Sequence, residues 1–303
     1  TFYSIAIEDI KEAADIFRPV YERTRGGDGY VSIEVSPRYA NDTEATIRDA
    51  HQLWERIERP NLMIKIPATR AGLPAITETI SHGINVNVTL IFSIDRYSDV
   101  MDAFMAGLEH RLMKGKSVEH IASVASFFVS RLDTLVDDLL QEKIMASPDI
   151  SKQLAHLKGK AAVANARLAY RLFEQTRDGP RCSAIVDQGA QMQRPLWAST
   201  STKNPAYSDI LYIEELIGPN TVNTMPPKTL QAFKGHGKAE STIRKDVEQA
   251  GEIMDRLAST RIIMDVVTQK LEDDGVAAFF QSFENLLVVI EGRRKVILSH
   301  SDS

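Results

Sequence analysis

The sequence predicts an α/β protein in which parallel strands alternate with helices. Short runs rich in β-branched residues, several of which end at proline or serine, are followed by stretches of helical periodicity, and the pair recurs about every 25 to 40 residues. Crossover helices join parallel rather than antiparallel strands, so the sheet is expected to be parallel. From this pattern alone, two architectures stay open: a closed eight-stranded barrel, and an open sheet with helices on both faces.

Glycine and proline positions define the first elements. Helical periodicity begins near Glu8 and stops at the glycines of residues 25–29. A strand is expected over 30–35, where β-branched residues predominate, and Pro37 cannot continue a hydrogen-bonded ladder. An aspartate then predicts the N-cap of the helix at 42–57.

The same alternation continues to the end of the sequence. Apolar runs predict strands over 62–66, 85–91, 124–129, 195–200 and 221–225. Amphipathic stretches predict helices over 73–81, 96–112, 132–140, 150–175 and 276–290. The basic run 293–295 follows the last of these, where positive charge suits a helix C-terminus. Six strands are therefore expected, whereas a closed barrel needs eight. Since the sequence begins at Thr1 rather than Met, we expect either an N-terminally incomplete barrel or an open sheet.

Composition excludes several classes of protein. The apolar share of 43% and the charged share of 25% are those of a globular chain. The 36 basic and 41 acidic residues give a net charge of -5, without the positive field of a nucleic-acid binder. A single cysteine, Cys182, forms no internal disulfide, which favours the cytoplasm. No apolar run is long enough for a membrane span, so neither nucleic acid nor membrane is expected as a partner.

Glycine motifs for phosphate binding do not follow the strands. Neither G-x-G-x-x-G nor G-x-x-x-x-G-K-[ST] occurs after any of them, which disfavours dinucleotide and nucleoside triphosphate binding. The glycine- and lysine-rich run 234–238 is expected to be a plain turn. Seven scattered histidines without H-E-x-x-H spacing predict no metal site.

Four polar side chains interrupt the apolar strands: Glu34, Lys65, Asn87 and Thr89. Burying such groups is costly unless they have partners or a function. At the carboxyl ends of neighbouring barrel strands, Glu34 and Lys65 would point into one pocket. Apolar surroundings disfavour an ammonium group, and a neutral amine attacks carbonyl carbon to form a Schiff base, so Lys65 is the candidate nucleophile. The alternatives are an edge-strand lysine or an ion pair with Glu34, and hydrogen bonding within the sheet for Asn87 and Thr89.

Several of these stretches together resemble the transaldolase family. Residues 31–35 (VSIEV), 63–69 (MIKIPAT), 87–93 (NVTLIFS) and 126–131 (SFFVSR) resemble its third to sixth barrel strands, in order. Residues 194–204 (RPLWASTSTKN) and 223–226 (NTMP) resemble the seventh and eighth strands of its longer bacterial and plant-like branch. The resemblance implies a TIM-type (β/α)₈ barrel, with six of the eight strands identifiable, in a single domain over residues 1–303.

The resemblance also implies roles for individual residues. Lys65 would form the Schiff base with a ketose phosphate, and Glu34 would shuttle protons through a water beside Thr89. Asn87 and Ser126 would bind the dihydroxyacetone portion of the sugar. Four further residues would bind the sugar phosphate: Arg131, Ser199, Ser201 and Lys203. An alternative for Arg131 is a surface ion pair with Asp133 or with a neighbouring acidic residue. The chemistry needs no metal and no cofactor, and sugar phosphates are the expected partners.

Departures from the family pattern leave other functions open. The family's first-strand aspartate, and the Ser-Asn-Pro-like turn of its second strand, have no counterpart in this sequence. The alternatives are a class I aldolase of the fructose-6-phosphate type and a catalytically incomplete sugar-phosphate binding protein. A barrel with two open edges also predicts either poor stability or a homo-oligomer that covers the edges.

Overall fold

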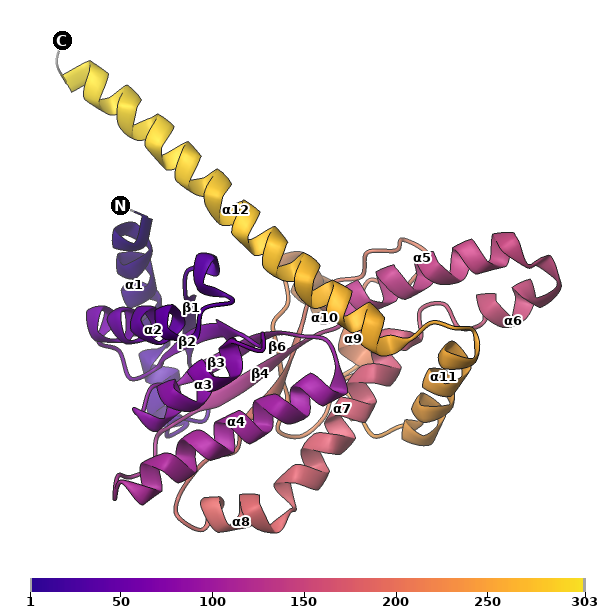
Figure 1. Cartoon of the computed structure of the whole chain (residues 1–303), viewed down its shortest axis with the longest axis horizontal. Helices are drawn as coiled ribbons and strands as arrows, with labels where there is room; N and C mark the ends of the chain where they lie inside the picture. Colours follow the sequence, from indigo (N-terminus) through magenta and orange to yellow (C-terminus); the bar gives the residue numbers. More distant parts are fainter. Residues whose placement is uncertain (1, 302–303) are drawn as a thin grey trace.

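The computed structural model describes residues 2–301 and contains one parallel sheet of six strands (Figure 1). The strands are β1 (Val31–Glu34), β2 (Leu62–Pro67), β3 (Val86–Ile91), β4 (Ser123–Phe128), β5 (Arg194–Ala198) and β6 (Val222–Asn223). Each pairs with the next in chain order, and within residues 2–301 β1 and β6 do not pair with each other. The sheet is therefore a half-barrel, which confirms six parallel strands of a TIM-type fold.

Twelve α-helices and two short 3₁₀ turns are formed by the described residues. The helices are α1 (Phe2–Arg23), α2 (Thr43–Ile57), α3 (Gly72–Ser81), α4 (Ile94–Met113), α5 (Ser130–Ala146), α6 (Ser151–Ala155), α7 (Ala161–Arg177), α8 (Pro180–Val186), α9 (Leu211–Glu214), α10 (Pro227–His236), α11 (Val247–Ser259) and α12 (Met264–Ser301). The 3₁₀ turns are η1 (Pro37–Tyr39) and η2 (Pro148–Ile150). None of the helices formed by residues 2–301 combines the length and apolar content that a membrane crossing needs.

Side-chain caps explain where two of the helices begin. Asp42 has an extended backbone and accepts a hydrogen bond from Ala45 N at 2.9 Å, which confirms the predicted N-cap of α2. Ser93 caps α4 in the same way, accepting from Arg96 N at 3.0 Å. These caps fix the point at which the chain leaves the carboxyl end of a strand and turns back.

Two predicted helices near the ends of the sequence are present but longer than expected. α1 starts at Phe2, well before Glu8, because the ring of Phe2 packs edge-on against that of Phe283 in α12, with centroids 5.4 Å apart. α12 runs from Met264 to Ser301, so the basic run 293–295 lies inside a helix rather than after one. Gly292 followed by basic residues has the pattern of a helix C-terminus, which explains the error.

Three further predictions also needed correction. The helix expected over 150–175 is interrupted between α6 and α7, where Gly159 adopts a left-handed conformation with φ of +68°. The strand expected over 221–225 is only two residues long. Residues 234–236 of the expected turn belong to α10, because a glycine can occupy a helix at a cost of about 1 kcal/mol.

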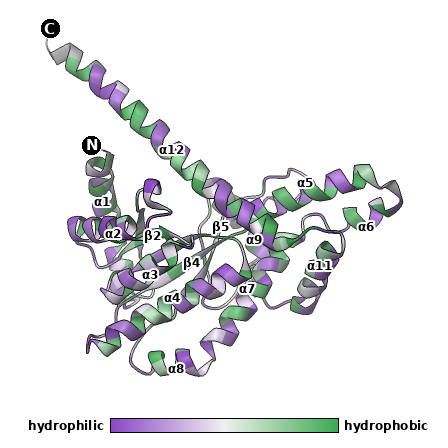
Figure 2. Ribbon diagram, in the orientation of Figure 1, coloured by the Kyte–Doolittle hydropathy of each residue, from purple (hydrophilic) through white to green (hydrophobic). Residues whose placement is uncertain are grey.

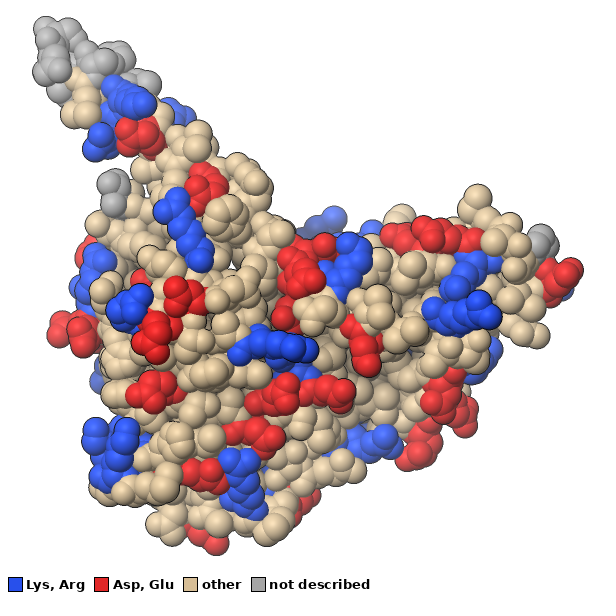
Figure 3. All heavy atoms as spheres, viewed as in Figure 1, with Lys and Arg blue, Asp and Glu red and all other residues tan. Residues whose placement is uncertain are grey.

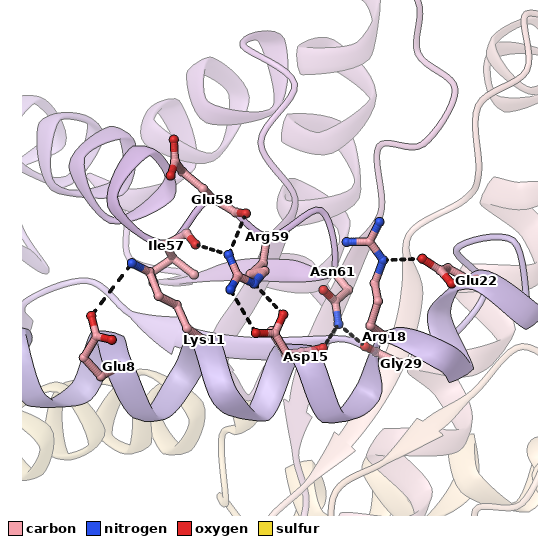
Figure 4. Close-up of polar contacts among 11 residues, drawn as sticks. Glu8, Lys11, Asp15, Arg18, Glu22, Gly29, Ile57, Glu58, Arg59 and Asn61 are labelled. Atoms are coloured by element: carbon pink, nitrogen blue, oxygen red, sulfur yellow. Dashed lines mark hydrogen bonds and ion pairs between the residues drawn. The ribbon is translucent and has the colours of Figure 1, made fainter.

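α1 is fastened to the segment that leads into β2 (Figure 4). The Arg59 guanidinium donates to both carboxylate oxygens of Asp15, at 2.6 and 2.9 Å. The buried Asn61 amide donates to Ala14 O at 2.8 Å and Gly29 O at 2.9 Å. Because Asn61 is buried, its two hydrogen bonds contribute more than the exposed ion pair of Arg59.

The last helix leaves the body of the molecule. α12 first packs over the carboxyl ends of the strands, and its C-terminal part then projects away from the fold (Figure 1). Apolar and polar residues alternate along the projecting part (Figure 2). Basic and acidic side chains are interspersed over the face shown in Figure 3, without a large patch of one sign, in keeping with the small net charge of -5.

Candidate active site

The pairing of the first three strands aligns three of the predicted site residues. Glu34 of β1 lies opposite Lys65 of β2, and Lys65 lies opposite Asn87 of β3. Lys65 Nζ is 3.5 Å from Glu34 Oε2, so the expected ion pair is present. β2 lies between β1 and β3, and Lys65 is therefore not an edge-strand lysine. The two side chains are 24% and 26% exposed, which leaves the amine accessible beside a carboxylate.

Asn87 joins three strands through its side-chain amide. Its Nδ2 donates to Ser32 Oγ at 3.1 Å, and its Oδ1 accepts from Ser126 Oγ at 2.7 Å. Asn87 and Ser126 are buried, so hydrogen bonding of Asn87 within the sheet is confirmed. Ser32 was missed by sequence reasoning, although its spacing of two from Glu34 puts both side chains on one face of β1. These bonds fix the amide beside Lys65.

Thr89 follows Asn87 by two residues in β3, but the two side chains differ in their hydrogen bonding. Its side chain is fully buried, and its hydroxyl makes no hydrogen bond with any described residue. The next residue, Leu90, has φ of +61°, and the pairing of β3 with β4 shifts register there. Left-handed backbone is unfavourable for leucine, and such strain occurs often at functional sites. A buried hydroxyl without a partner is costly, and the alternative of hydrogen bonding within the sheet is wrong for the Thr89 side chain.

Burial changes the protonation of the carboxylate beside the amine. Burial raises the pKa of Glu34 above its usual value, and the neighbouring Lys65 ammonium opposes part of this effect. The protonated carboxyl group therefore persists to higher pH than in an exposed glutamate. A carboxyl group that exchanges protons closer to neutral pH suits general acid–base chemistry.

A residue from the far end of the chain also contacts the amine. Lys65 Nζ lies 5.7 Å from the centroid of the Phe279 ring, which α12 places over the carboxyl ends of the strands. A cavity of about 250 Å³ beside Glu34 is lined by Phe279 and by Tyr3 of α1. Sequence reasoning missed Phe279, because no local pattern relates α12 to β2.

Arg131 lies in the first turn of α5, directly after β4. Its guanidinium carbon is 5.3 Å from the centroid of the Phe128 ring. The proposed alternative, an ion pair with Asp133, is wrong. Both oxygens of Asp133 are used elsewhere: they accept hydrogen bonds from Ala162 N at 2.7 Å and from Tyr212 OH at 2.8 Å.

The remaining three predicted residues lie in the loop after β5. Ser199 has φ of +55°, and its Oγ is 2.9 Å from Oγ of Ser130, the neighbour of Arg131. Lys203 Nζ donates to Ser201 Oγ at 3.0 Å. Among residues 2–301, no hydrogen bond or ion pair joins these two residues to Arg131 or Lys65. The structure thus brings Ser199 beside α5 and pairs Ser201 with Lys203 on the same loop.

The described residues contain no cluster of potential metal-binding side chains. No three His, Cys, Asp or Glu side chains of residues 2–301 are grouped so that they could hold a metal ion. The candidate site is instead an amine, a carboxyl group, an amide and hydroxyls at the carboxyl ends of neighbouring strands. An amine in such surroundings can attack a sugar carbonyl while the carboxyl group transfers protons.

Asp133 predicts a pH-dependent contribution to stability. Burial raises the pKa of Asp133 to about 7, although hydrogen bonds from Ala162 and Tyr212 favour the carboxylate. In the unfolded chain the pKa of an aspartate is about 4. The contribution of protonated Asp133 to the free energy of unfolding is therefore fully present below about pH 4 and is lost as pH rises through about 7. We expect the Asp133→Asn variant to lack this loss, so that its Tm rises relative to the wild type between about pH 5 and pH 8.

Thermal unfolding followed by circular dichroism at several pH values measures this effect. Asp138→Asn, on the exposed side of the same helix, is the matched control and should give a curve parallel to that of the wild type. A curve for Asp133→Asn that is also parallel to the wild type would contradict the prediction.

Comparison with known proteins decides the family. The family model described as Transaldolase/Fructose-6-phosphate aldolase matches residues 1–290. The chain belongs to this family. It is 47% identical over 298 residues to the transaldolase of Trichodesmium erythraeum (strain IMS101), covering 97% of this chain and 78% of that protein. It is 51% identical over 284 residues to the transaldolase of Thermobifida fusca (strain YX), covering 93% and 76%.

A third relative agrees with these two. Transaldolase 1 of Streptomyces avermitilis is 52% identical over 283 residues, which cover 93% of this chain and 73% of the relative. The similarity to transaldolases of the longer bacterial branch therefore extends over nearly the whole chain, and the resemblance read from the strand motifs is confirmed. As a transaldolase-family protein, the chain is a transferase with a barrel-type fold.

Proposed function

We propose that this chain transfers a dihydroxyacetone unit from a ketose phosphate to an aldose phosphate, as a transaldolase of the pentose phosphate pathway, with Lys65 as the nucleophile. The donors are sedoheptulose 7-phosphate or fructose 6-phosphate, and the acceptors are glyceraldehyde 3-phosphate or erythrose 4-phosphate. The observation that carries this proposal is the Lys65 amine 3.5 Å from the Glu34 carboxylate, on the strand next to Asn87.

In the proposed reaction, Lys65 Nζ attacks C2 of the ketose, and loss of water leaves an imine. The protonated imine withdraws electrons, so the C3–C4 bond breaks, the C4 hydroxyl loses its proton, and the aldose departs. A three-carbon enamine stays on Lys65 until it attacks the aldehyde of the acceptor. Hydrolysis of the new imine then frees the amine.

The neighbouring residues support this chemistry in distinct ways. Glu34, with Thr89 close by on β3, carries protons during imine formation and hydrolysis, in keeping with its raised pKa. Asn87 and Ser126, fixed to each other at 2.7 Å, bind the hydroxyls of the three-carbon unit. Phosphate binding is assigned to Arg131, whose guanidinium suits a phosphate, together with Ser199, Ser201 and Lys203.

We further propose that residues 1–303 act as one domain, in the cytoplasm, on sugar phosphates. Self-association of the chain is part of the same proposal. Within residues 2–301, the outer edges of β1 and β6 have no pairing strand, and such edges favour pairing with another chain.

Borohydride trapping tests the proposed function. The chain is incubated with fructose 6-phosphate and sodium borohydride, and then studied by intact mass and peptide mapping. We expect a stable adduct on Lys65, because the reductant converts the imine to a secondary amine. A folded sample without an adduct would overturn the proposal and favour a sugar-phosphate binding protein.

The family description also names a second candidate activity, that of a fructose-6-phosphate aldolase. Such an enzyme also forms the imine but releases dihydroxyacetone instead of transferring it. Competition between water and an added aldose acceptor separates the two. Transfer to erythrose 4-phosphate without free dihydroxyacetone supports the transaldolase, and release regardless of acceptor supports the aldolase.

A further inference from the structure

The loop after β5 is attached to α5 by hydrogen bonds that the proposed reaction does not use. Residues 199–210 form no helix or strand, and they carry three of the assigned phosphate ligands. A connection of this length has little regular hydrogen bonding of its own, so side-chain contacts determine its shape. The points at which the loop is held therefore decide where its polar groups lie.

Two of these points lie at the ends of the loop. Ser130 Oγ is 2.9 Å from Ser199 Oγ at the start of the loop, and Tyr212 OH donates to Asp133 at 2.8 Å just after its end. Ser130 and Asp133 are three residues apart on α5, and Asp137 follows four residues later. This spacing places all three side chains on one face of the helix.

Asp137 forms the third attachment, in the middle of the loop. Its Oδ2 accepts a hydrogen bond from Tyr207 OH at 2.6 Å, and its Oδ1 accepts one from Gly159 N at 2.9 Å. Gly159 has φ of +68°, and a Cβ at this position would lie 2.7 Å from Cζ of Tyr207. The turn before α7 is thus shaped to accept the tyrosine ring, so both the ring and the hydroxyl of Tyr207 are fixed.

These contacts connect the two parts of the assigned phosphate site, which are Arg131 on α5 and the ligands on the loop after β5. α5 carries Arg131 in its first turn and Asp137 further along the same rigid helix. Between the loop and α5 lies a cavity of about 230 Å³, whose lining includes Lys203 and Tyr207 together with Asp133, Asp137 and Asp138, and does not include Arg131. Its acidic lining belongs to the attachment of the loop and not to the phosphate site itself. Because Tyr207 is only four residues from Lys203, holding Tyr207 to α5 also limits how far Lys203 can move relative to Arg131.

We propose that Asp137 and Tyr207 are positioning residues for recognition of the substrate phosphate, an inference that rests on the proposed function. Their hydrogen bond holds the loop that carries Ser201 and Lys203 at a fixed place relative to Arg131. Neither residue touches the sugar. Preorganising the ligands lowers the entropy that phosphate binding would otherwise cost.

The test compares a phosphorylated with an unphosphorylated ketose. In the full chain, Tyr207→Phe removes the hydroxyl and keeps the ring, whereas Tyr30→Phe removes a tyrosine hydroxyl that donates to Gly26 O at 2.7 Å, in the turn before β1. For each variant, the concentration of ketose that gives half-maximal borohydride adduct is measured with fructose 6-phosphate and with fructose. We expect Tyr207→Phe to raise this concentration about tenfold for fructose 6-phosphate and to leave it unchanged for fructose. Tyr30→Phe should change neither.

Asp137→Ala supplies a second variant. Asp137→Ala removes the hydrogen bond from Tyr207 and also the one from Gly159 N, so its effect on fructose 6-phosphate should be at least as large as that of Tyr207→Phe. The double variant should not exceed Asp137→Ala alone, because the bond that Tyr207→Phe removes is already lost. Equal changes for both sugars would indicate a general structural role and overturn the inference, as would no change for either sugar.

If the wild-type chain forms no borohydride adduct, the proposed function fails, and this result is distinct from failure of the inference about Asp137 and Tyr207. The inference is then judged by stabilisation of the chain by inorganic phosphate in thermal unfolding. Weaker stabilisation of Tyr207→Phe than of Tyr30→Phe supports it, and equal or absent stabilisation overturns it.

Discussion

Replacement of Lys65 by alanine is expected to abolish formation of the imine and to lower transfer activity on the order of 10⁴-fold or more. The imine is expected to form on the Lys65 amine itself, which lies 3.5 Å from the Glu34 carboxylate, and alanine has no group that could replace it. Borohydride trapping followed by peptide mapping, and a coupled assay of transfer to erythrose 4-phosphate, measure the two effects.

Two further variants make the Lys65 result specific. Lys65→Arg keeps a cation beside Glu34 and cannot form an imine, so it should retain the wild-type Tm more closely than Lys65→Ala while remaining inactive. Lys11→Ala removes another partly buried, ion-paired lysine, 3.8 Å from Glu8, and should leave trapping unchanged. An adduct of undiminished yield in Lys65→Ala, mapped to a different lysine, would show that the nucleophile lies elsewhere.

The second large effect is expected for Glu34→Gln. An amide cannot donate or accept the protons that imine formation and hydrolysis require, so turnover should fall about 10²- to 10⁴-fold. Burial raises the pKa of Glu34, and the acid form of the wild type should therefore be lost at a higher pH than for a free glutamate. The pH profile of kcat/KM should therefore contain a limb, a pH-dependent change in rate, that arises from titration of Glu34. The Glu34→Gln variant should lack this limb.

Steady-state rates between about pH 4 and pH 9 measure that limb. Glu22→Gln is the control, because Glu22 is an exposed carboxylate paired with Arg18 at 2.8 Å and should give a wild-type profile. If Glu34→Gln keeps both the wild-type rate and the wild-type profile, Glu34 is not the proton carrier.

Much of the fold could be predicted because the strands are buried. β2 and β3 are covered on both faces, so they read as nearly continuous apolar runs in which a lysine or an asparagine stands out. This contrast is also why Lys65 and Asn87 could be identified as candidates. The ends of the two-residue β6 could not be predicted, because they depend on pairing with β5 and not on its own residues.

Other parts of the site depend on contacts between distant segments. Phe279 reaches Lys65 only because α12 crosses the carboxyl ends of the strands, and no local pattern specifies that path. The hydrogen bond between Tyr207 and Asp137 likewise joins a loop to a helix that lies far from it in the sequence. Such pairings are set by the tertiary fold, which periodicity and capping signals do not describe.

The order in which the site's residues occur in the chain also bears on its synthesis by the ribosome. Each strand pairs with the strand made just before it, so Glu34, Lys65, Asn87 and Ser126 can come together once the first four strands have emerged. Domains begin to fold from the N-terminus during translation, at about 5–20 residues per second. The ring of Phe279 belongs to α12, which is made after all six strands. In a nascent chain, the Lys65 amine therefore lacks the aromatic ring beside it until α12 has been made and has docked.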